Sequence, residues 1–229
     1  MIRTLIRPFV ALYCFVKLVR NPEDDLDNVL GMLNSLIDAD VVARIRRSLP
    51  DHPQVKAALI SRPRVAPVDM DALAALPEGT LGHAWATFMA AHGFSLNDLK
   101  PQHNGEGDFW ISTHMRETHD LTHMLTGFGT DIPGEMGVQG FNAAQMPGLP
   151  VPYLLFAGVL LNNAAGQGPA VAMERVKAFQ RGYALGLRSK LLFGLDWSAM
   201  WSRPLAEVRA ELGLDLRASS AQLEQAVAA

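Results

Sequence analysis

The spacing of the apolar residues is the feature that most restricts the fold of this chain. Apolar side chains recur at intervals of three or four residues, as in the segment from Val29 to Ile37. The alternation of apolar and polar residues that marks a half-buried strand is not found. A chain of 229 residues can bury a sizeable core. We therefore predict an all-α fold, with residues 1–229 forming a single multi-helix domain.

Proline and glycine residues divide this pattern into separate helices, because proline fits a first helical turn and glycine commonly follows a last one. One helix is expected after Thr130 or Asp131, and its small side chains would let a neighbouring helix approach closely. These small residues are Gly134, Gly137, Gly140 and Ala144. A polar tail is expected over 214–229. The other predicted helices cover residues 79–92, 109–126, 153–165, 169–193 and 204–212, with a further one beginning after Asn21.

The first twenty residues combine basic and apolar side chains. On a helical wheel the basic residues fall on one arc of roughly 140°. They are Arg3, Arg7, Lys17 and Arg20. The longest apolar run, Pro8 to Val16, is far shorter than the ~20 residues that cross a bilayer. Residues 1–20 are therefore predicted to form a basic amphipathic helix. It could lie on an anionic membrane surface, or it could pack on the core with its charges in water.

The charge balance and the cysteine count exclude two classes of function. Twenty basic residues against 23 acidic ones give a net charge of -3, so no strongly basic field is available for a nucleic-acid backbone. We therefore expect no nucleic-acid partner. The single cysteine, Cys14, excludes an internal disulfide and a thiolate metal cluster. A reducing compartment is the natural interpretation.

The segment from Thr118 to Phe141 contains the pattern with the clearest chemical meaning. His119 and His123 are four residues apart, about 40° on a helical wheel, so both rings can face one point. Asp120 lies roughly 60° from His123 on the same wheel. Glu135 follows a glycine-rich turn, and a helix–turn–helix hairpin would return its carboxylate to the histidines. These four residues are the candidate metal ligands and the candidate catalytic residues.

Two imidazoles and two carboxylates form a ligand set that suits zinc, iron(II) and manganese. The lack of thiolates argues against a purely structural zinc site. Histidines at this spacing also occur on helices as packed or solvated side chains, without any metal. Zinc proteases have Glu after the first histidine, whereas Asp120 stands there in this chain. Metal-dependent hydrolysis is therefore a less favoured hypothesis.

This segment resembles the coenzyme Q (ubiquinone) biosynthesis protein four family, which carries a His-Asp-x-x-His motif and a later Gly-Glu at this spacing. The likeness extends over about residues 20–214. It includes an Asn-Pro-Glu-Asp block at 21–24 and a Leu-Pro-x-Gly-Thr-Leu-Gly block at 76–82. It continues through Arg116-Glu117 and a tryptophan block from Asp196 to Gly213. The blocks thus cover nearly the whole chain.

Three positions depart from the family's pattern. His114 stands where the family often has Arg, Met115 where it often has Tyr, and Asp131 where many members have Asn. His114 adds a third imidazole, but it lies roughly 140° from His119 on the wheel. We therefore leave His114 outside the ligand set. These departures concern the substrate rather than the metal ligands.

The resemblance implies an all-α protein, attached peripherally to a membrane, that takes part in making ubiquinone. Family members are implicated in removing the C1 carboxyl of a polyprenylated hydroxybenzoate ring, with hydroxylation at that carbon. The chain would be a decarboxylase, a lyase, with its metal held by His119, Asp120, His123 and Glu135. Zinc is the first choice, with iron, manganese or magnesium as alternatives. We interpret Arg116, about one turn before Asp120, as the contact for the substrate carboxylate.

A second hypothesis is a prenyl-lipid-binding scaffold of the ubiquinone biosynthesis complex, whose metal only joins two helices. The expected partners are the polyprenylated quinone precursor, a membrane surface, other ubiquinone biosynthesis proteins and further copies of the chain in a homo-oligomer. Because the Asn-Pro-Glu-Asp block begins at residue 21, little room is left for a cleaved mitochondrial presequence. We therefore expect a bacterial protein on the cytoplasmic face of the inner membrane.

Overall fold

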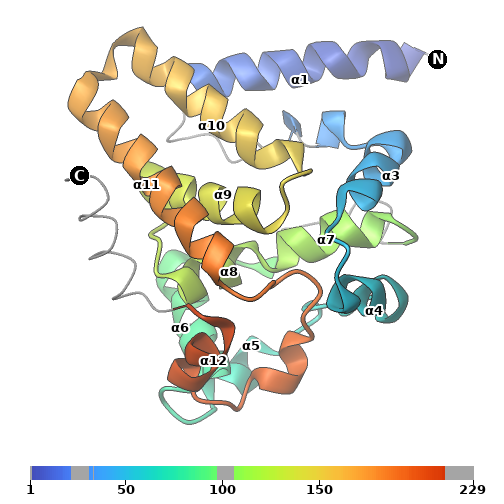
Figure 1. Cartoon of the computed structure of the whole chain (residues 1–229), viewed down its shortest axis with the longest axis vertical. Helices are drawn as coiled ribbons and strands as arrows, with labels where there is room; N and C mark the ends of the chain where they lie inside the picture. Colours follow the sequence, from blue (N-terminus) through green and yellow to red (C-terminus); the bar gives the residue numbers. More distant parts are fainter. Residues whose placement is uncertain (1, 22–30, 33, 97–105, 215–229) are drawn as a thin grey trace.

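The computed structural model describes residues 2–21, 31–32, 34–96 and 106–214, which form helices joined by loops (Figure 1). Among these residues the only β-type pairing is one isolated bridge between Thr80 and Pro204. The prediction of an all-α fold is therefore confirmed. In the described part of the chain, no helix is both long enough and apolar enough to cross a membrane.

Side-chain caps and glycines define most of the helix ends. The helices are α1 (Ile2–Arg20), α3 (Ala39–Ser48), α4 (Pro53–Ser61), α5 (Met70–Ala74), α6 (Leu81–His92), α7 (Phe109–Glu117), α8 (His119–Thr126), α9 (Ile132–Gln145), α10 (Pro150–Asn162), η3 (Asn163–Gln167), α11 (Pro169–Arg188), η4 (Trp197–Met200) and α12 (Leu205–Leu212). Before α3, α5, α6 and α9, an Asp or Thr side chain accepts a backbone N–H of the first turn. Left-handed glycines end α6, α8 and α12.

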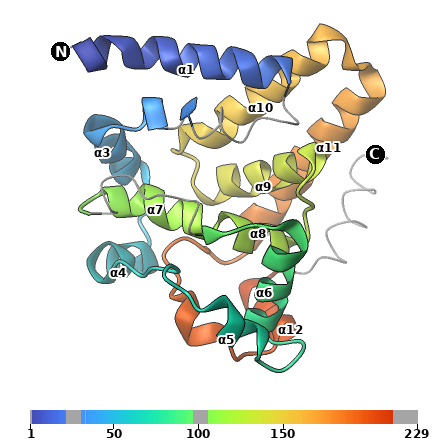
Figure 2. The same ribbon diagram turned by 180° about the vertical axis from the view of Figure 1, so that it is seen from behind.

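Helices α9 and α11 form the most extensive helix pair, and they meet at glycines (Figure 2). A Cβ atom on Gly182 of α11 would overlap the carbonyl oxygen of Gly137 on α9. A Cβ atom on Gly140 would overlap the carbonyl oxygen of Phe179. The small side chains of α9 thus allow the close approach that the sequence predicted.

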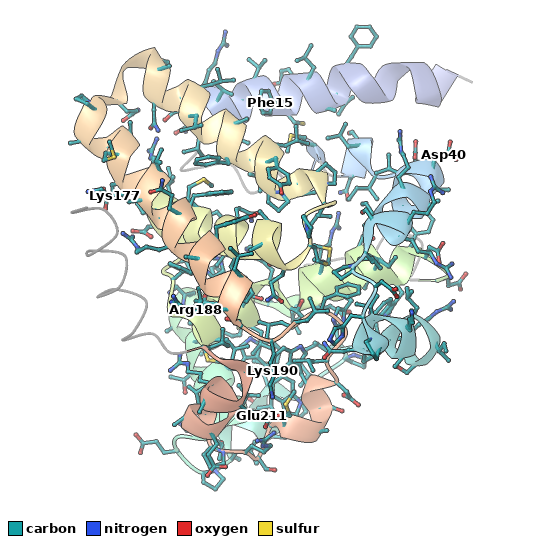
Figure 3. All side chains as sticks on the ribbon, viewed as in Figure 1. Phe15, Asp40, Lys177, Arg188, Lys190 and Glu211 are labelled. Carbon is teal, nitrogen blue, oxygen red and sulfur yellow. The ribbon has the colours of Figure 1, made fainter. Side chains whose placement is uncertain are left out.

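Buried side chains form three apolar clusters. Figure 3 shows that side chains fill the space between the helices. The first contains Leu121 and Leu125 of α8 together with Trp85 and Trp197. The second joins α1, α10 and α11 to Met136 of α9. The third lies among α3, α4 and α7. Helix α8 is anchored in the first cluster, whereas α9 enters the first through Phe141 and the second through Met136. The hairpin between them is therefore supported by both clusters.

Helix α1 packs along α10 at one edge of the molecule (Figures 1 and 2). Its buried stripe consists of Ala11, Cys14 and Leu18. A second apolar set points to solvent, and Phe9 in this set is 73% exposed. The other large members are Val10, Leu12, Tyr13 and Val16. The side chains of Arg3 and Arg7 lie outside the described part. The helix therefore packs on the core and also presents apolar side chains to its surroundings.

The predicted helix over 109–126 is divided at Thr118 into α7 and α8. The Thr118 hydroxyl donates to the carbonyl oxygen of His114 at 2.8 Å. Such bonding by a threonine to the carbonyl four residues earlier bends helices. The prediction of one continuous helix was wrong, and the second helix begins at His119.

Two later helix boundaries also differ from the prediction. Helix α10 occupies Pro150–Asn162 rather than 153–165, and it runs into the π-type turn η3. Helix α11 ends at Arg188 rather than at residue 193, because Ser189 is extended. Beyond that end the backbone N–H of Leu192 donates to Oε1 of Gln145, at 2.8 Å. This bond holds the following segment against α9.

The predicted C-terminal tail begins one residue too early. Leu214 is buried in the first apolar cluster and belongs to the core. The remainder of the tail, 215–229, lies outside the described residues, as does the predicted helix start at 22–30.

Candidate metal centre

The turn between α8 and α9 positions the candidate ligands. Gly127 adopts a left-handed conformation (φ 72°) and ends α8. Oδ1 of Asp131 then accepts the backbone N–H of Gly134 at 2.9 Å and caps α9. Gly134 packs so closely on Gly129 that a Cβ atom would overlap the Gly129 carbonyl. This compact turn places Glu135, in the first turn of α9, beside the histidines of α8.

Three side-chain atoms converge between the two helices. Nε2 of His119 and Nε2 of His123 are 3.2 Å apart. Oε2 of Glu135 lies 3.1 Å from Nε2 of His123 and 3.3 Å from Nε2 of His119. Ligands bound at about 2.1 Å are separated by about 3.0 Å in octahedral and about 3.4 Å in tetrahedral coordination. Within the described residues this is the one cluster of metal-binding side chains found, and its spacing suits a single divalent cation.

Hydrogen bonds orient two of these three atoms, those of His123 and Glu135, as acceptors. Nδ1 of His123 lies 2.9 Å from the carbonyl oxygen of Gly129, so this nitrogen carries the proton and Nε2 presents its lone pair. Nε2 of Gln139 donates to Oε1 of Glu135 at 2.6 Å, which directs the other carboxylate oxygen at the histidines. Converging lone pairs repel one another unless a cation or a proton lies between them. The donor arrangement therefore fits a metal ion.

When no cation is bound, a proton shared between His119 and Glu135 offsets the repulsion between the converging atoms. Burial favours a lower pKa for His119, but the charge and hydrogen bond of Glu135, aided by Asp120, raise the pKa of His119 to about 9. Burial favours a higher pKa for Glu135, but His119 and His123 hold that pKa well below its usual range. A protonated His119 thus pairs with an ionised Glu135, and a metal ion has to displace that proton.

The cluster is closed on one side and open on the other. The side chain of His123 is 3% exposed, whereas those of His119 and Glu135 are 34% and 31% exposed. A cation held by three protein ligands would therefore keep a side for water or substrate. This is the arrangement of catalytic rather than structural zinc sites.

The structure does not bring all of the predicted site residues together. Asp120 lies outside the group of three converging atoms. Burial raises its pKa, against the opposite influence of His119 and His123. Arg116 on α7 donates a hydrogen bond to Oδ1 of Asn34 at 2.6 Å, and burial lowers its pKa. Metal ligation by Asp120 and substrate binding by Arg116 stay predictions.

His114 supports the fold rather than the site. Its Nδ1 donates to the carbonyl oxygen of Pro63 at 3.1 Å, and its Nε2 accepts the backbone N–H of Gly194 at 3.0 Å. Burial lowers the pKa of His114 to about 4, so the ring is neutral at pH 7. With both nitrogens engaged by the backbone, His114 is not part of the ligand cluster.

Gln139 is a site residue that the sequence analysis missed. It follows Glu135 by four residues on α9, so both side chains lie on the same helix face. That spacing was the one sequence signal for a contact between Gln139 and Glu135. Gln139 was overlooked because the search was for histidine and carboxylate ligands, and its side chain is an amide. Its role became visible only through its hydrogen bond to Glu135.

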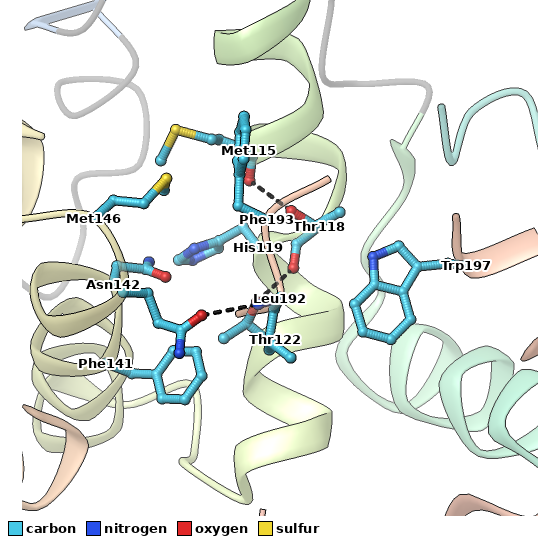
Figure 4. A pocket seen from close by; sticks show the side chains of 11 residues that line it. Met115, Thr118, His119, Thr122, Phe141, Asn142, Met146, Leu192, Phe193 and Trp197 are labelled. Carbon is cyan, nitrogen blue, oxygen red and sulfur yellow. Dashed lines mark hydrogen bonds between the residues drawn. The ribbon is translucent and has the colours of Figure 1, made fainter. Parts of the chain in front are cut away.

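A narrow pocket borders the cluster at His119 (Figure 4). Side chains from α7 to α9 and from the segment after α11 line it, and most of them are apolar. In Figure 4, Met115 and Met146 lie on one side of the pocket and Trp197 on the other. His119 thus belongs to the cluster and to the pocket wall at once.

The helical fold and the open His-His-Glu cluster define an all-α protein with a candidate metal centre. The family model of "Coenzyme Q (ubiquinone) biosynthesis protein Coq4" matches residues 4–217. The chain therefore belongs to this family, as its motifs predicted. Its role lies in ubiquinone biosynthesis.

Relatives of known name are similar over most of the chain. A mitochondrial ubiquinone biosynthesis protein COQ4 homolog of Danio rerio is 27% identical, over 93% of this chain and 78% of its own length. A COQ4 homolog 1 of Culex quinquefasciatus is 28% identical, over 82% of this chain and 68% of its own length. The crystal structure of a candidate ubiquinone biosynthesis protein from Nostoc punctiforme superposes with a TM-score of 0.76. It is 27% identical and covers 91% of this chain and 98% of that one.

Proposed function

We propose that this protein is a metal-dependent decarboxylase that removes the C1 carboxyl of a polyprenylated hydroxybenzoate, with hydroxylation at that carbon. The observation that carries the proposal is the convergence of three acceptor atoms within 3.1–3.3 Å of one another beside a pocket. Replacing the carboxyl by a hydroxyl removes two electrons from the ring, so an oxidant such as dioxygen has to be supplied.

His119, His123 and Glu135 would hold the cation, with zinc favoured by the nitrogen and oxygen donors and by the open side. Iron, manganese and magnesium remain alternatives. A bound divalent cation would supply Lewis-acid stabilisation of charge on a carboxylate or phenolic oxygen. Gln139 fixes the carboxylate of Glu135, and the Gly129 carbonyl fixes the tautomer of His123.

Two further residues would act on the substrate. Burial raises the pKa of Asp120, so its carboxyl can hold a proton beside the cluster at higher pH than an exposed one. Asp120 is proposed as a fourth ligand or as the group that moves this proton. Arg116 is proposed to bind the substrate carboxylate, for which its guanidinium would exchange its bond to Asn34.

The tail of the substrate and the surface of α1 point to a membrane. A polyprenyl chain needs an apolar path, and α10 is apolar along most of its length. The exposed apolar side chains of α1, with Lys17 and Arg20 beside them, suit an anionic lipid surface. We propose peripheral attachment to the cytoplasmic face of a bacterial inner membrane. Other ubiquinone biosynthesis proteins and further copies of this chain would be the partners there.

The proposal is tested by measuring ubiquinone production in cells that lack their own protein for this step and express this chain or its variants. We expect His123→Ala and Glu135→Gln to abolish production while the purified variants keep the circular dichroism of the parent. The matched controls are His52→Ala and Glu78→Gln, which change exposed residues outside the cluster. Full production by the double variant of His123 and Glu135 would overturn the enzymatic proposal.

The alternative is a prenyl-lipid-binding scaffold whose metal joins α8 to α9. The burial of α8 and α9 in apolar clusters favours this hypothesis, because a metal ion between two such helices would add to the stability of the fold. In that case the variants would lose stability and partner binding together. Conversion of a carboxylated ring by the purified, zinc- or iron-loaded chain would exclude the scaffold as the whole function.

A further inference from the structure

The indole N–H of Trp197 is buried without a hydrogen-bond partner. Trp197 is 2% exposed, and its Nε1 meets no acceptor among the residues that the structure describes. Buried donors are nearly always paired with protein, water or ligand. An unpaired one in the wall of a pocket therefore indicates where an acceptor from outside the chain would bind.

The indole N–H faces the pocket that borders His119. In Figure 4 the nitrogen lies on the edge of the ring that is turned toward Thr118, across the pocket. The neighbouring hydroxyls are already engaged: Thr118 donates to the His114 carbonyl, and Thr122 donates to the Thr118 carbonyl. The amide of Gln145 bonds to the backbone of Leu192 and of Gly186. Besides the half-buried amide of Asn142, the indole of Trp197 is a donor that this wall still offers.

The chain contains a matched comparison in Trp85. Trp85 is fully buried in the same apolar cluster, and its Nε1 also has no hydrogen-bond partner in the described part of the chain. Trp85 does not line the pocket, and its ring stacks on Trp201 with centroids 5.1 Å apart. Changing either tryptophan to phenylalanine removes a buried N–H from the same core, but only Trp197→Phe removes it from the pocket.

We propose that Trp197 is a substrate-binding residue whose indole N–H donates a hydrogen bond to an oxygen of the aromatic head group. This inference rests on the proposed function, because it takes the ligand to be a hydroxybenzoate ring placed beside the metal cluster. The ring would lie between His119 and Trp197, with its ring hydroxyl or carboxylate oxygen as the acceptor. The pocket has a volume of about 40 Å³, less than an aromatic ring needs, so the ring enters only when the flexible side chains of Met115 and Met146 shift.

The test follows the indole N–H signals of the zinc-loaded full chain, labelled with 15N-tryptophan, during titration with 3-prenyl-4-hydroxybenzoate. The signal that disappears in Trp197→Phe identifies Trp197. We expect this signal to move downfield with the probe, while the signal of Trp85 stays in place. By calorimetry, Trp197→Phe should weaken binding of the probe about tenfold, the loss expected for one hydrogen bond, whereas Trp85→Phe should stay within about twofold of the parent.

The possible outcomes distinguish a failure of the Trp197 hydrogen bond from a failure of the proposed function. Binding that moves other signals but not that of Trp197, or equal affinity of the two variants, would overturn the hydrogen bond and leave the proposed function standing. A zinc-loaded parent chain that does not bind the probe would overturn the proposed substrate and the hydrogen bond with it. Thermal unfolding of both variants checks that they are folded, and the titration of the parent chain needs no substitution.

Discussion

His114 and His123 are both buried, and both donate their Nδ1 proton to a backbone carbonyl. They differ in what their Nε2 atoms meet. The Nε2 of His114 accepts the backbone N–H of Gly194, whereas that of His123 faces another imidazole and a carboxylate. A donor satisfies the first nitrogen, and only a proton or a cation can satisfy the second. The partner of the Nε2 atom therefore distinguishes the structural His114 from the candidate ligand His123.

The neutral His114 predicts a loss of stability in acid. Its folded pKa of about 4 lies below the usual unfolded value of about 6.5, so the unfolded chain binds the proton first. The contribution of His114 is complete above pH 6.5 and is lost as the pH falls toward 4. It should amount to about 3 kcal/mol over this range. Urea unfolding at pH 7 and pH 4 should show a smaller pH effect in His114→Gln than in the parent. An unchanged pH effect would contradict this.

Gln139 should control metal affinity without being a ligand. Gln139→Leu keeps the side-chain volume but removes the donor to Oε1 of Glu135, so the carboxylate loses its orientation. We expect zinc to bind about ten- to a hundredfold more weakly, as measured by competition with a chelating dye. Gln54→Leu is the control, because Gln54 also donates through its side-chain amide, to the carbonyls of Leu191 and Phe193, but not to a residue of the cluster. Equal zinc affinity of Gln139→Leu and the parent would show that the hydrogen bond does not matter.

At the scale of helices, local sequence signals predicted the hairpin but not its surroundings. The caps and glycines between Thr126 and Gly134 are local, so the turn and the approach of Glu135 to the histidines could be predicted. The break at Thr118 also rests on a local bond, from its hydroxyl to the His114 carbonyl, but threonine occurs inside continuous helices too, so the residue alone did not predict the break. The path of the chain after α11 depends on the distant bond from Leu192 to Gln145, which no local signal predicts. The position of Trp197 in the pocket could not be predicted, because it depends on packing against α7 and α8, which lie far from Trp197 along the chain.

The close contact between α9 and α11 predicts that adding a single methyl group at this contact destabilises the fold. In Gly182→Ala the new methyl group would overlap the Gly137 carbonyl, and the two helices would have to separate. We expect a loss of about 2 kcal/mol or more in the free energy of unfolding. Gly158→Ala is the control, since its methyl group would meet the flexible side chain of Leu18 at 3.2 Å. A gain in stability for Gly182→Ala, as at an open helix position, would refute the close packing.

At the scale of the whole molecule, α1 gives the protein one apolar edge away from the metal cluster. Replacing Phe9, Leu12 and Tyr13 together by Ser should leave the fold intact, because these side chains are exposed. Sedimentation with vesicles that contain anionic lipid should show binding at least about tenfold weaker, since each apolar side chain adds ~1.5–3 kcal/mol when it enters lipid. Ile60→Ser is the control, because Ile60 on α4 is 86% exposed. Undiminished binding of the triple variant would exclude α1 as the attachment surface.

The central claim is that one cation binds between two helices at three side-chain atoms. Elemental analysis of the purified full chain, saturated with zinc and dialysed, measures this most directly. We expect one ion per chain in the parent and in His52→Ala, and almost none in His119→Ala, His123→Ala or Glu135→Gln. One tightly bound ion per chain retained by all three cluster variants would contradict the account.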